Sequence, residues 1–80
     1  MIELDQVGVA YGSDTDKAKK LLVQAARECP LSSKTANAKA LFLGFGDSTL
    51  DLELRVYIED YDQHADMLDD IHGRIDRLFR

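Results

Sequence analysis

Residues 50–58, LDLELRVYI, alternate strictly between apolar and polar side chains. Successive side chains of a β-strand point to opposite faces, so this pattern predicts a strand with one apolar and one polar face. The apolar set consists of Leu50, Leu52, Leu54, Val56 and Ile58, and the polar set includes Asp51, Glu53, Arg55 and Tyr57. We expect helices to cover the apolar face.

The segment before this strand predicts the first arm and the turn of a β-hairpin. The run Gly44-Phe45-Gly46-Asp47-Ser48 follows apolar residues and is rich in turn formers. It has glycines like a phosphate-binding loop, but it lacks Gly-Lys-Ser/Thr and precedes a strand instead of a helix. We therefore interpret it as a tight turn. The buried face of the first arm stays open between two sets: Ala40 with Phe42, or Leu41, Leu43 and Phe45.

The first part of the chain predicts a strand and then a helix. Residues 2–11 form the expected strand, in which Val7, Val9 and Tyr11 alternate with small residues. Either Ser13 or Asp14 can cap the helix that follows, and Pro30 ends it. Its apolar positions follow helical spacing and form one continuous stripe: Ala18, Leu21, Leu22, Ala25, Ala26 and Cys29.

A second helix is predicted after the alternating strand, with Asp62 as its expected cap. On a helical wheel its inward-facing residues fall within one arc: His64, Leu68, Ile71, His72, Ile75, Leu78 and Phe79. Acidic residues gather in its first half and basic residues at its end, which suits the helix dipole.

The predicted order of strand, helix, strand, strand, helix indicates an α+β fold. It matches the ferredoxin-like plan β-α-β-β-α-β as a two-layer sandwich that lacks the final strand. We expect residues 1–80 to form a single domain. The third strand should lie centrally, with the first strand beside it and parallel to it. Both helices should cover the apolar face of the third strand.

Composition narrows the possible functions of these 80 residues. Ten basic and fifteen acidic residues give a net charge of −5, which argues against nucleic acid and against direct insertion into an anionic membrane surface. The single cysteine, Cys29, excludes an internal disulfide and suits a reducing compartment. No apolar run approaches the roughly 20 residues that a membrane span needs.

The candidate chemical groups favour structural roles, and we expect no catalytic, cofactor-binding or metal site. His64 and His72 lie eight residues apart, about 12 Å along a helix, too far to share one metal ion. Asp14 and Asp16 lack the glycine and glutamate that a calcium loop would need. Acylphosphatase-like chemistry would need an arginine after the first strand, and RNA recognition would need a basic and aromatic sheet face. Neither is present.

The polar face of the alternating strand is a candidate interaction surface. If the helices cover the other side, Asp51, Glu53, Arg55 and Tyr57 stand on an open sheet face. An exposed tyrosine among mixed charges suits either water or a partner subunit. We therefore take these four residues as a possible subunit-contact face.

Two segments of the chain resemble a known family. Residues 7–14, VGVAYGSD, and above all residues 44–56, GFGDSTLDLELRV, resemble the C-terminal cytoplasmic α/β domain of the small-conductance mechanosensitive channels, the MscS family. That family typically reads G-(F/L)-G-D-S-S-(V/L)-(D/N)-(L/F)-x-(L/V)-R-V. The motif positions carried over are Gly44, Gly46, Asp47, Ser48 and Arg55, whereas Thr49 replaces the usual serine.

The resemblance implies a non-enzymatic assembly and vestibule domain on the cytoplasmic side of the cell membrane. The parent would be a membrane channel that opens under bilayer tension and releases solutes on osmotic downshock. It would assemble with seven subunits, whereas these residues alone are expected to form a weak dimer through the open edge of the first strand. The alternative is a free-standing ferredoxin-like sensory module that binds a small ligand.

Overall fold

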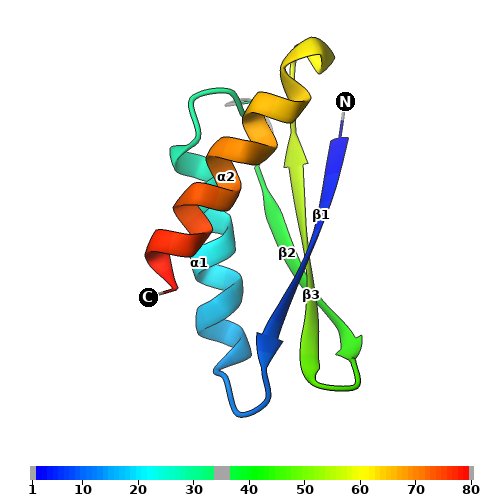
Figure 1. The fold of residues 1–80 in the computed structure, drawn as a ribbon. Helices are drawn as coiled ribbons and strands as arrows, with labels where there is room; N and C mark the ends of the chain where they lie inside the picture. The colour runs from blue at the N-terminus through cyan, green and yellow to red at the C-terminus, as the bar shows by residue number, and fades with distance from the viewer. Residues whose placement is uncertain (1, 34–36, 80) are drawn as a thin grey trace.

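The computed structural model describes residues 2–33 and 37–79, with backbone only for Ile2 and Glu3. Three strands and two helices follow one another in the predicted order, with a short 3-10 turn before the last helix. The elements are β1 (Ile2–Ala10), α1 (Thr15–Glu28), β2 (Lys39–Phe45), β3 (Thr49–Tyr57), η1 (Tyr61–Gln63) and α2 (His64–Leu78). Both helices lie on one side of the sheet (Figure 1), which confirms the two-layer α+β architecture of a ferredoxin-like fragment.

The sheet has the order β1-β3-β2, so β3 is central as expected. The predicted parallel pairing of the first and third strands is wrong, because β1 runs antiparallel to β3. β2 is also antiparallel to β3. The crossover through α1 therefore makes β1 and β2 parallel to each other, and β3 inserts between them in the opposite direction (Figure 1).

The core lies between the sheet and the two helices. The whole apolar set of β3 and the following residue Ile58 is buried, as predicted from the alternation. α1 contributes Ala18, Leu22, Ala25 and Ala26, and Cys29 after it is also buried. From α2, the fully buried residues are Met67 and Ile71, whereas His72 is exposed. Met67 was outside the predicted arc, so the inward face of α2 is rotated toward it.

Side chains cap both helical segments. Asp14 is the cap of α1, and its Oδ1 accepts a hydrogen bond from the backbone N–H of Lys17 at 3.1 Å. The expected cap at Asp62 is wrong: α2 itself follows Gln63, whose side chain makes no capping hydrogen bond, and Asp60 instead caps η1 by accepting from the backbone N–H of Asp62 at 3.0 Å. The cap lies two residues earlier because η1 precedes α2 and starts the helical segment at Tyr61.

A β-bulge decides which side of β2 faces the helices. Ala40 lies opposite Leu54 and Phe42 lies opposite Leu52, so both point to the helical side of the sheet. The register shifts between Phe42 and Gly44, after which Phe45 lies opposite Leu50. Because a bulge adds one residue to a strand, Phe45 returns to the helical side despite its odd spacing from Phe42.

Candidate functional site

The family-motif turn between β2 and β3 is held by close contacts around Gly46. The backbone N–H of Gly46 donates to the carbonyl of Thr49 at 2.7 Å. The hydroxyl of Thr49 in turn donates to Oδ1 of Asp51 at 2.9 Å. A Cβ on Gly46 would lie 2.9 Å from Oγ1 of Thr49 and 3.1 Å from Oδ1 of Asp51. The turn therefore requires a glycine here for space, and Asp47 and Ser48 form its exposed tip.

Two more glycines flank Asp51 on the sheet face that points away from the helices. Gly8 lies opposite Asp51 on β1, and Gly44 lies opposite it on β2. Because neither neighbour has a side chain, a hollow of about 550 Å³ forms around Asp51 and Thr49. The sequence pattern placed Gly44 in the hairpin turn and Gly8 among the small residues of the first strand, and the strand register gives both of them this further effect.

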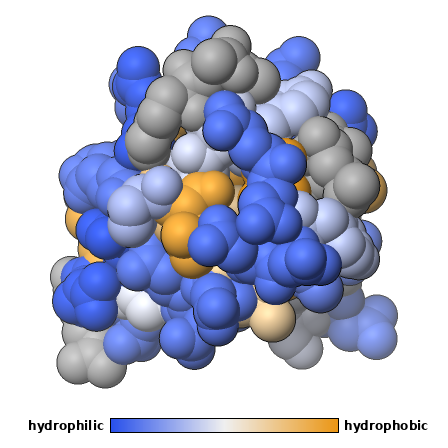
Figure 2. All heavy atoms as spheres, turned by 90° about the horizontal axis from the view of Figure 1, so that it is seen from above, coloured by the Kyte–Doolittle hydropathy of each residue, from blue (hydrophilic) through white to orange (hydrophobic). Residues whose placement is uncertain are grey.

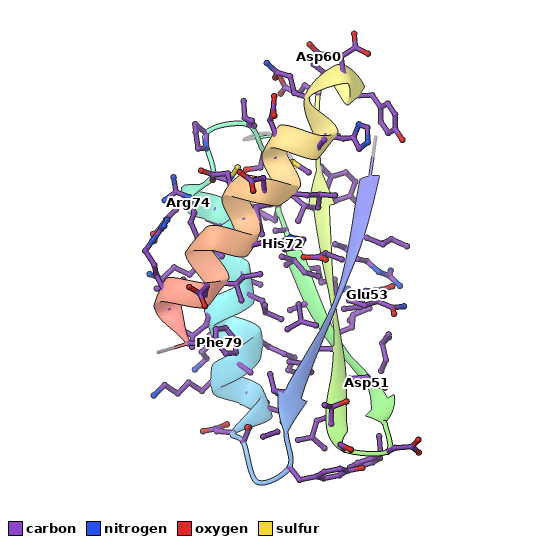
Figure 3. All side chains as sticks on the ribbon, viewed as in Figure 1. Asp51, Glu53, Asp60, His72, Arg74 and Phe79 are labelled. Atoms are coloured by element: carbon purple, nitrogen blue, oxygen red, sulfur yellow. The ribbon has the colours of Figure 1, made fainter. Side chains whose placement is uncertain are left out.

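The rest of the possible subunit-contact face is only partly open. Glu53 is 7% exposed even though no helix covers it, because Gln6 and Leu41 stand directly beside it on the neighbouring strands. Its carboxylate Oε2 accepts from Nε of Arg55 at 3.1 Å. Asp51 and Arg55 are half-buried and Tyr57 is exposed. Figure 3 shows Asp51 and Glu53 on the side of the sheet away from both helices.

Three aromatic side chains gather at the hairpin end of the sheet. The rings of Tyr11 and Phe45 stack with centroids 6.4 Å apart. Phe42 meets Phe45 edge-on at 5.4 Å, and the Tyr11 hydroxyl donates to the carbonyl of Gly46. All three rings are exposed to solvent, Phe45 to 74%. We call Tyr11, Phe42 and Phe45 the aromatic cluster.

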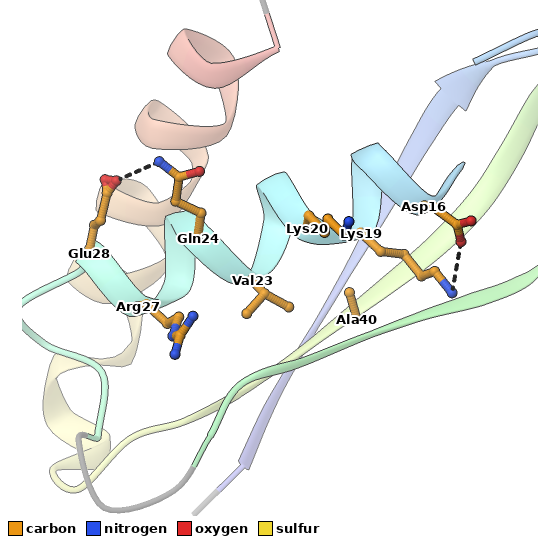
Figure 4. Close-up of a pocket in the computed structure, with 8 residues that line it drawn as sticks. All are labelled: Asp16, Lys19, Lys20, Val23, Gln24, Arg27, Glu28 and Ala40. Atoms are coloured by element: carbon orange, nitrogen blue, oxygen red, sulfur yellow. Dashed lines mark hydrogen bonds and ion pairs between the residues drawn. The ribbon is translucent and has the colours of Figure 1, made fainter. Parts of the chain in front are cut away.

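A second hollow, of about 900 Å³, lies between α1 and β2. Val23 and Ala40 give it an apolar floor, and Lys19, Lys20 and Arg27 stand around it (Figure 4). Lys19 forms a long ion pair with Asp16 at 3.9 Å, and Gln24 donates to Glu28 at 3.1 Å. Asp16 and Glu28 also line the hollow, so its rim carries both signs of charge around the apolar floor.

The buried thiol of Cys29, after α1, is linked to an ion pair within α2. Nε of Arg74 donates to Oδ2 of Asp70 at 2.7 Å. This hydrogen bond lowers the pKa of the Asp70 carboxyl, and a hydrogen bond from Cys29 lowers it further. Burial raises the pKa of the Cys29 thiol, and Asp70 adds to the rise. A thiol held in its neutral form is a poor nucleophile, so this group suits a structural role.

The two histidines contact different neighbouring residues. The ring of His64 stacks on Tyr61 at 4.3 Å, and Nδ1 lies 2.8 Å from the Tyr61 carbonyl oxygen. His72 instead contacts Asp5 of β1. Across residues 2–33 and 37–79, no three His, Cys, Asp or Glu side chains are grouped closely enough to hold a metal ion.

The end of the molecule that carries η1 is acidic. Glu59, Asp60, Asp62 and Asp66 are all exposed there. Seen from above, the surface is mostly hydrophilic and apolar atoms show only in limited areas (Figure 2). In the part of the chain that the structure describes, neither helix has the length and apolar character needed to cross a membrane.

Comparisons with known proteins point to the same family as the hairpin motif does. The family described as "Mechanosensitive ion channel MscS, C-terminal" matches residues 6–80. An "Uncharacterized MscS family protein" of Haemophilus influenzae is 48% identical over 73 residues, which covers 91% of this chain and 7% of that protein. The "Mechanosensitive channel MscK" of Escherichia coli is 46% identical over 55 residues, 69% of this chain and 5% of its own length.

The chain thus spans less than a tenth of the length of these two curated relatives. The family match nevertheless covers both helices and almost all of the sheet. It includes the turn at Gly46, the glycine-flanked Asp51 and the central strand. The chain belongs to the MscS mechanosensitive ion channel family and corresponds to its C-terminal domain.

Proposed function

We propose that residues 1–80 form one non-enzymatic domain that assembles the cytoplasmic vestibule of a mechanosensitive channel. The family match over residues 6–80 is the observation that carries this proposal. In the full-length parent, copies of the domain associate into the family's seven-subunit cage on the cytoplasmic side of the membrane. The parent opens under bilayer tension and releases solutes during osmotic downshock.

The side-chain chemistry supports a structural role for the domain. Several ionisable side chains form pairs within the fold, among them Arg55 with Glu53, Arg74 with Asp70 and His72 with Asp5. The first pair lies along strand β3, the second spans one turn of α2, and the third joins the helical layer to the sheet. A side chain at Gly46 of the family motif would collide with Thr49 and Asp51 of the same hairpin. The geometry of the turn therefore explains why this position needs a glycine.

The proposal can be tested in cells that lack their own mechanosensitive channels. The full-length parent should protect such cells when they move from high to low osmolarity. Leu54→Ala removes a fully buried side chain from the domain, and we expect this variant to lose both protection and the subunit assembly measured in detergent. Leu4→Ala is the matched control, because the side chain removed there is exposed.

Two outcomes of this experiment would contradict the proposal. One is full protection and unchanged assembly by a Leu54→Ala parent whose domain is shown to be unfolded by protease sensitivity. The other is that the parent responds to a small ligand and that the Leu54→Ala variant loses this response although its subunits still assemble. That second outcome would favour a sensory module, for which the hollow between α1 and β2 is the site to examine.

A further inference from the structure

Positive charge is concentrated on α1, although the chain as a whole is acidic. α1 carries four basic and two acidic residues, whereas the 80 residues together carry ten basic and fifteen acidic ones. Lys17, Lys20 and Arg27 are exposed on this helix. α1 therefore presents a positive surface on a molecule whose net charge is −5.

Negative charge is concentrated in residues 59–70, which contain six acidic and no basic residues. We call this segment the acidic end; it includes η1 and the first half of α2, and its Asp60 lies at one tip of the molecule (Figure 3). The ring of Tyr61 is 48% exposed and stacks on His64 with centroids 4.3 Å apart. The acidic end thus presents an ordered aromatic ring among exposed carboxylates, which belong to Glu59, Asp60, Asp62, Asp66 and Asp69.

The hollow between α1 and β2 offers a surface that matches the acidic end. Val23 and Ala40 make its floor apolar, and three basic and two acidic side chains stand at its rim (Figure 4). Of the two acids, Asp16 is paired with Lys19 at 3.9 Å. Positive charge is therefore in excess around an apolar floor, which suits an aromatic ring flanked by carboxylates.

A ring of seven subunits needs contacts between two different surfaces of each copy. A two-fold contact uses the same patch on both copies and closes at two, whereas a head-to-tail contact joins different patches and can close into a ring. Copies with a net charge of −5 also repel each other overall. A favourable contact must therefore bring a positive patch of one copy to a negative patch of the next.

We propose that the acidic end of one copy docks into the hollow between α1 and β2 of the next copy. The inference rests on the proposed seven-subunit assembly and names the two surfaces that perform it. In this contact the ring of Tyr61 covers the apolar floor, and carboxylates such as Asp62 meet basic side chains such as Lys20. It places self-association on α1 and η1 instead of the β1 edge expected from the sequence, because paired β1 edges close at two copies.

Charge reversal on either side of the contact tests it in the 80-residue chain. In sedimentation at several hundred micromolar, the average mass should rise past that of a dimer, because a head-to-tail dimer keeps one unused patch at each end. Asp62→Lys and Lys20→Glu should each weaken association about fivefold. Asp62→Lys is the more decisive variant: it makes the net charge less negative, so it would strengthen an association limited by overall repulsion alone.

Matched controls make the same charge changes outside the two surfaces. Asp47→Lys changes the exposed tip of the hairpin turn, and Lys17→Glu changes an exposed position of α1 that does not line the hollow. Each control should change the dissociation constant less than about twofold. Circular dichroism and urea unfolding should show that all four variants keep the fold.

Mixing the two test variants gives an independent measurement. The Asp62→Lys copy keeps an intact hollow, and the Lys20→Glu copy keeps an intact acidic end. An equimolar mixture should therefore associate about threefold or more strongly than either variant alone. A variant that fails to associate because its own fold is damaged would not be rescued in this way.

Four results would overturn the inference. The unmodified chain could stay monomeric or stop at a dimer, Asp62→Lys could associate as strongly as the unmodified chain, a control could have as large an effect as its test variant, or the mixture could gain nothing. Each of these leaves the proposed function standing, because assembly and protection by the Leu54→Ala parent test it separately.

Discussion

The imidazole Nε2 of His72 lies 2.8 Å from Oδ2 of Asp5, which joins the second helix to the first strand. The pair links positions 67 residues apart in the sequence. The Asp5 side chain is 13% exposed and that of His72 is 55% exposed. The contact is therefore a half-exposed polar link at the margin of the core, on the same side of the sheet as the buried residues of β3.

A double-mutant cycle should find modest coupling between these two residues. We expect Asp5→Asn and His72→Gln to show a coupling free energy of about 0.2–1 kcal/mol, because solvent screens an exposed imidazole. Urea unfolding of the two single variants and the double variant gives this value. A second double-mutant cycle, on the Asp16–Lys19 pair of one exposed helix face, is the control. Its coupling free energy should be no larger than that of Asp5 and His72. Strictly additive effects at Asp5 and His72 would mean that the contact contributes nothing to stability.

Leu54→Ala should destabilise the domain strongly. Leu54 is fully buried between the sheet and the helices, and its truncation should lower the free energy of unfolding by about 2–5 kcal/mol. Leu4→Ala, on an exposed position of β1, should change it by less than about 0.5 kcal/mol. Urea titration measures both values. A loss below about 1 kcal/mol for Leu54→Ala would contradict the assignment of the core face.

Gly46→Ala should disturb the hairpin turn. The added methyl group would lie 2.9 Å from Oγ1 of Thr49, so Thr49 and Asp51 would have to move. We expect the free energy of unfolding to fall by about 1–3 kcal/mol, the usual cost of overpacking. Ser48→Ala in the exposed tip of the same turn is the control and should be nearly neutral. Equal stability of the two variants would show that the turn relaxes freely.

The buried thiol should make the domain less stable in alkaline solution. Burial raises the pKa of Cys29 above its ordinary value of 9.0, so the folded state holds this proton more strongly than the unfolded chain does. The contribution of the neutral thiol is fully present below 9.0 and is lost as the pH rises through 9.0 toward the folded pKa.

Cys29→Ala isolates this effect from other groups that titrate at high pH. Between about pH 8 and about pH 10, the stability of the parent chain should fall more steeply than that of the variant. Urea unfolding at several pH values provides the comparison. Identical pH dependence in the two proteins would mean that the Cys29 thiol ionises as easily in the folded state as in the unfolded chain.

The local patterns of the sequence were sufficient to predict the elements and the main core. Strict alternation identified β3 and its buried face, and helical spacing identified the stripe of α1 from Ala18 to Cys29. Asp14 was recognised as a possible cap from its residue type and position. These features depend on neighbours within a few residues, which is the range over which strand and helix periodicity operates.

The sequence motif of the hairpin also indicated the family, but the contacts within the hairpin could be described only from the structure. Gly46 could be assigned to a turn from sequence, whereas its contact with Asp51 depends on how β3 folds back. Likewise, Gly8 and Gly44 flank Asp51 only through the pairing of three strands. No local signal in the sequence brings these residues together.

The sequence by itself therefore determined which segments form strands and helices and which apolar residues form most of the core. Tertiary structure decided the antiparallel direction of β1, the bulge that returns Phe45 to the helical side, and the burial of Met67 and Glu53. It also decided the contact of His72 with Asp5. The physical reason is that periodicity is set by local backbone geometry, whereas register, bulges and side-chain partners are set by contacts between segments that are distant along the chain.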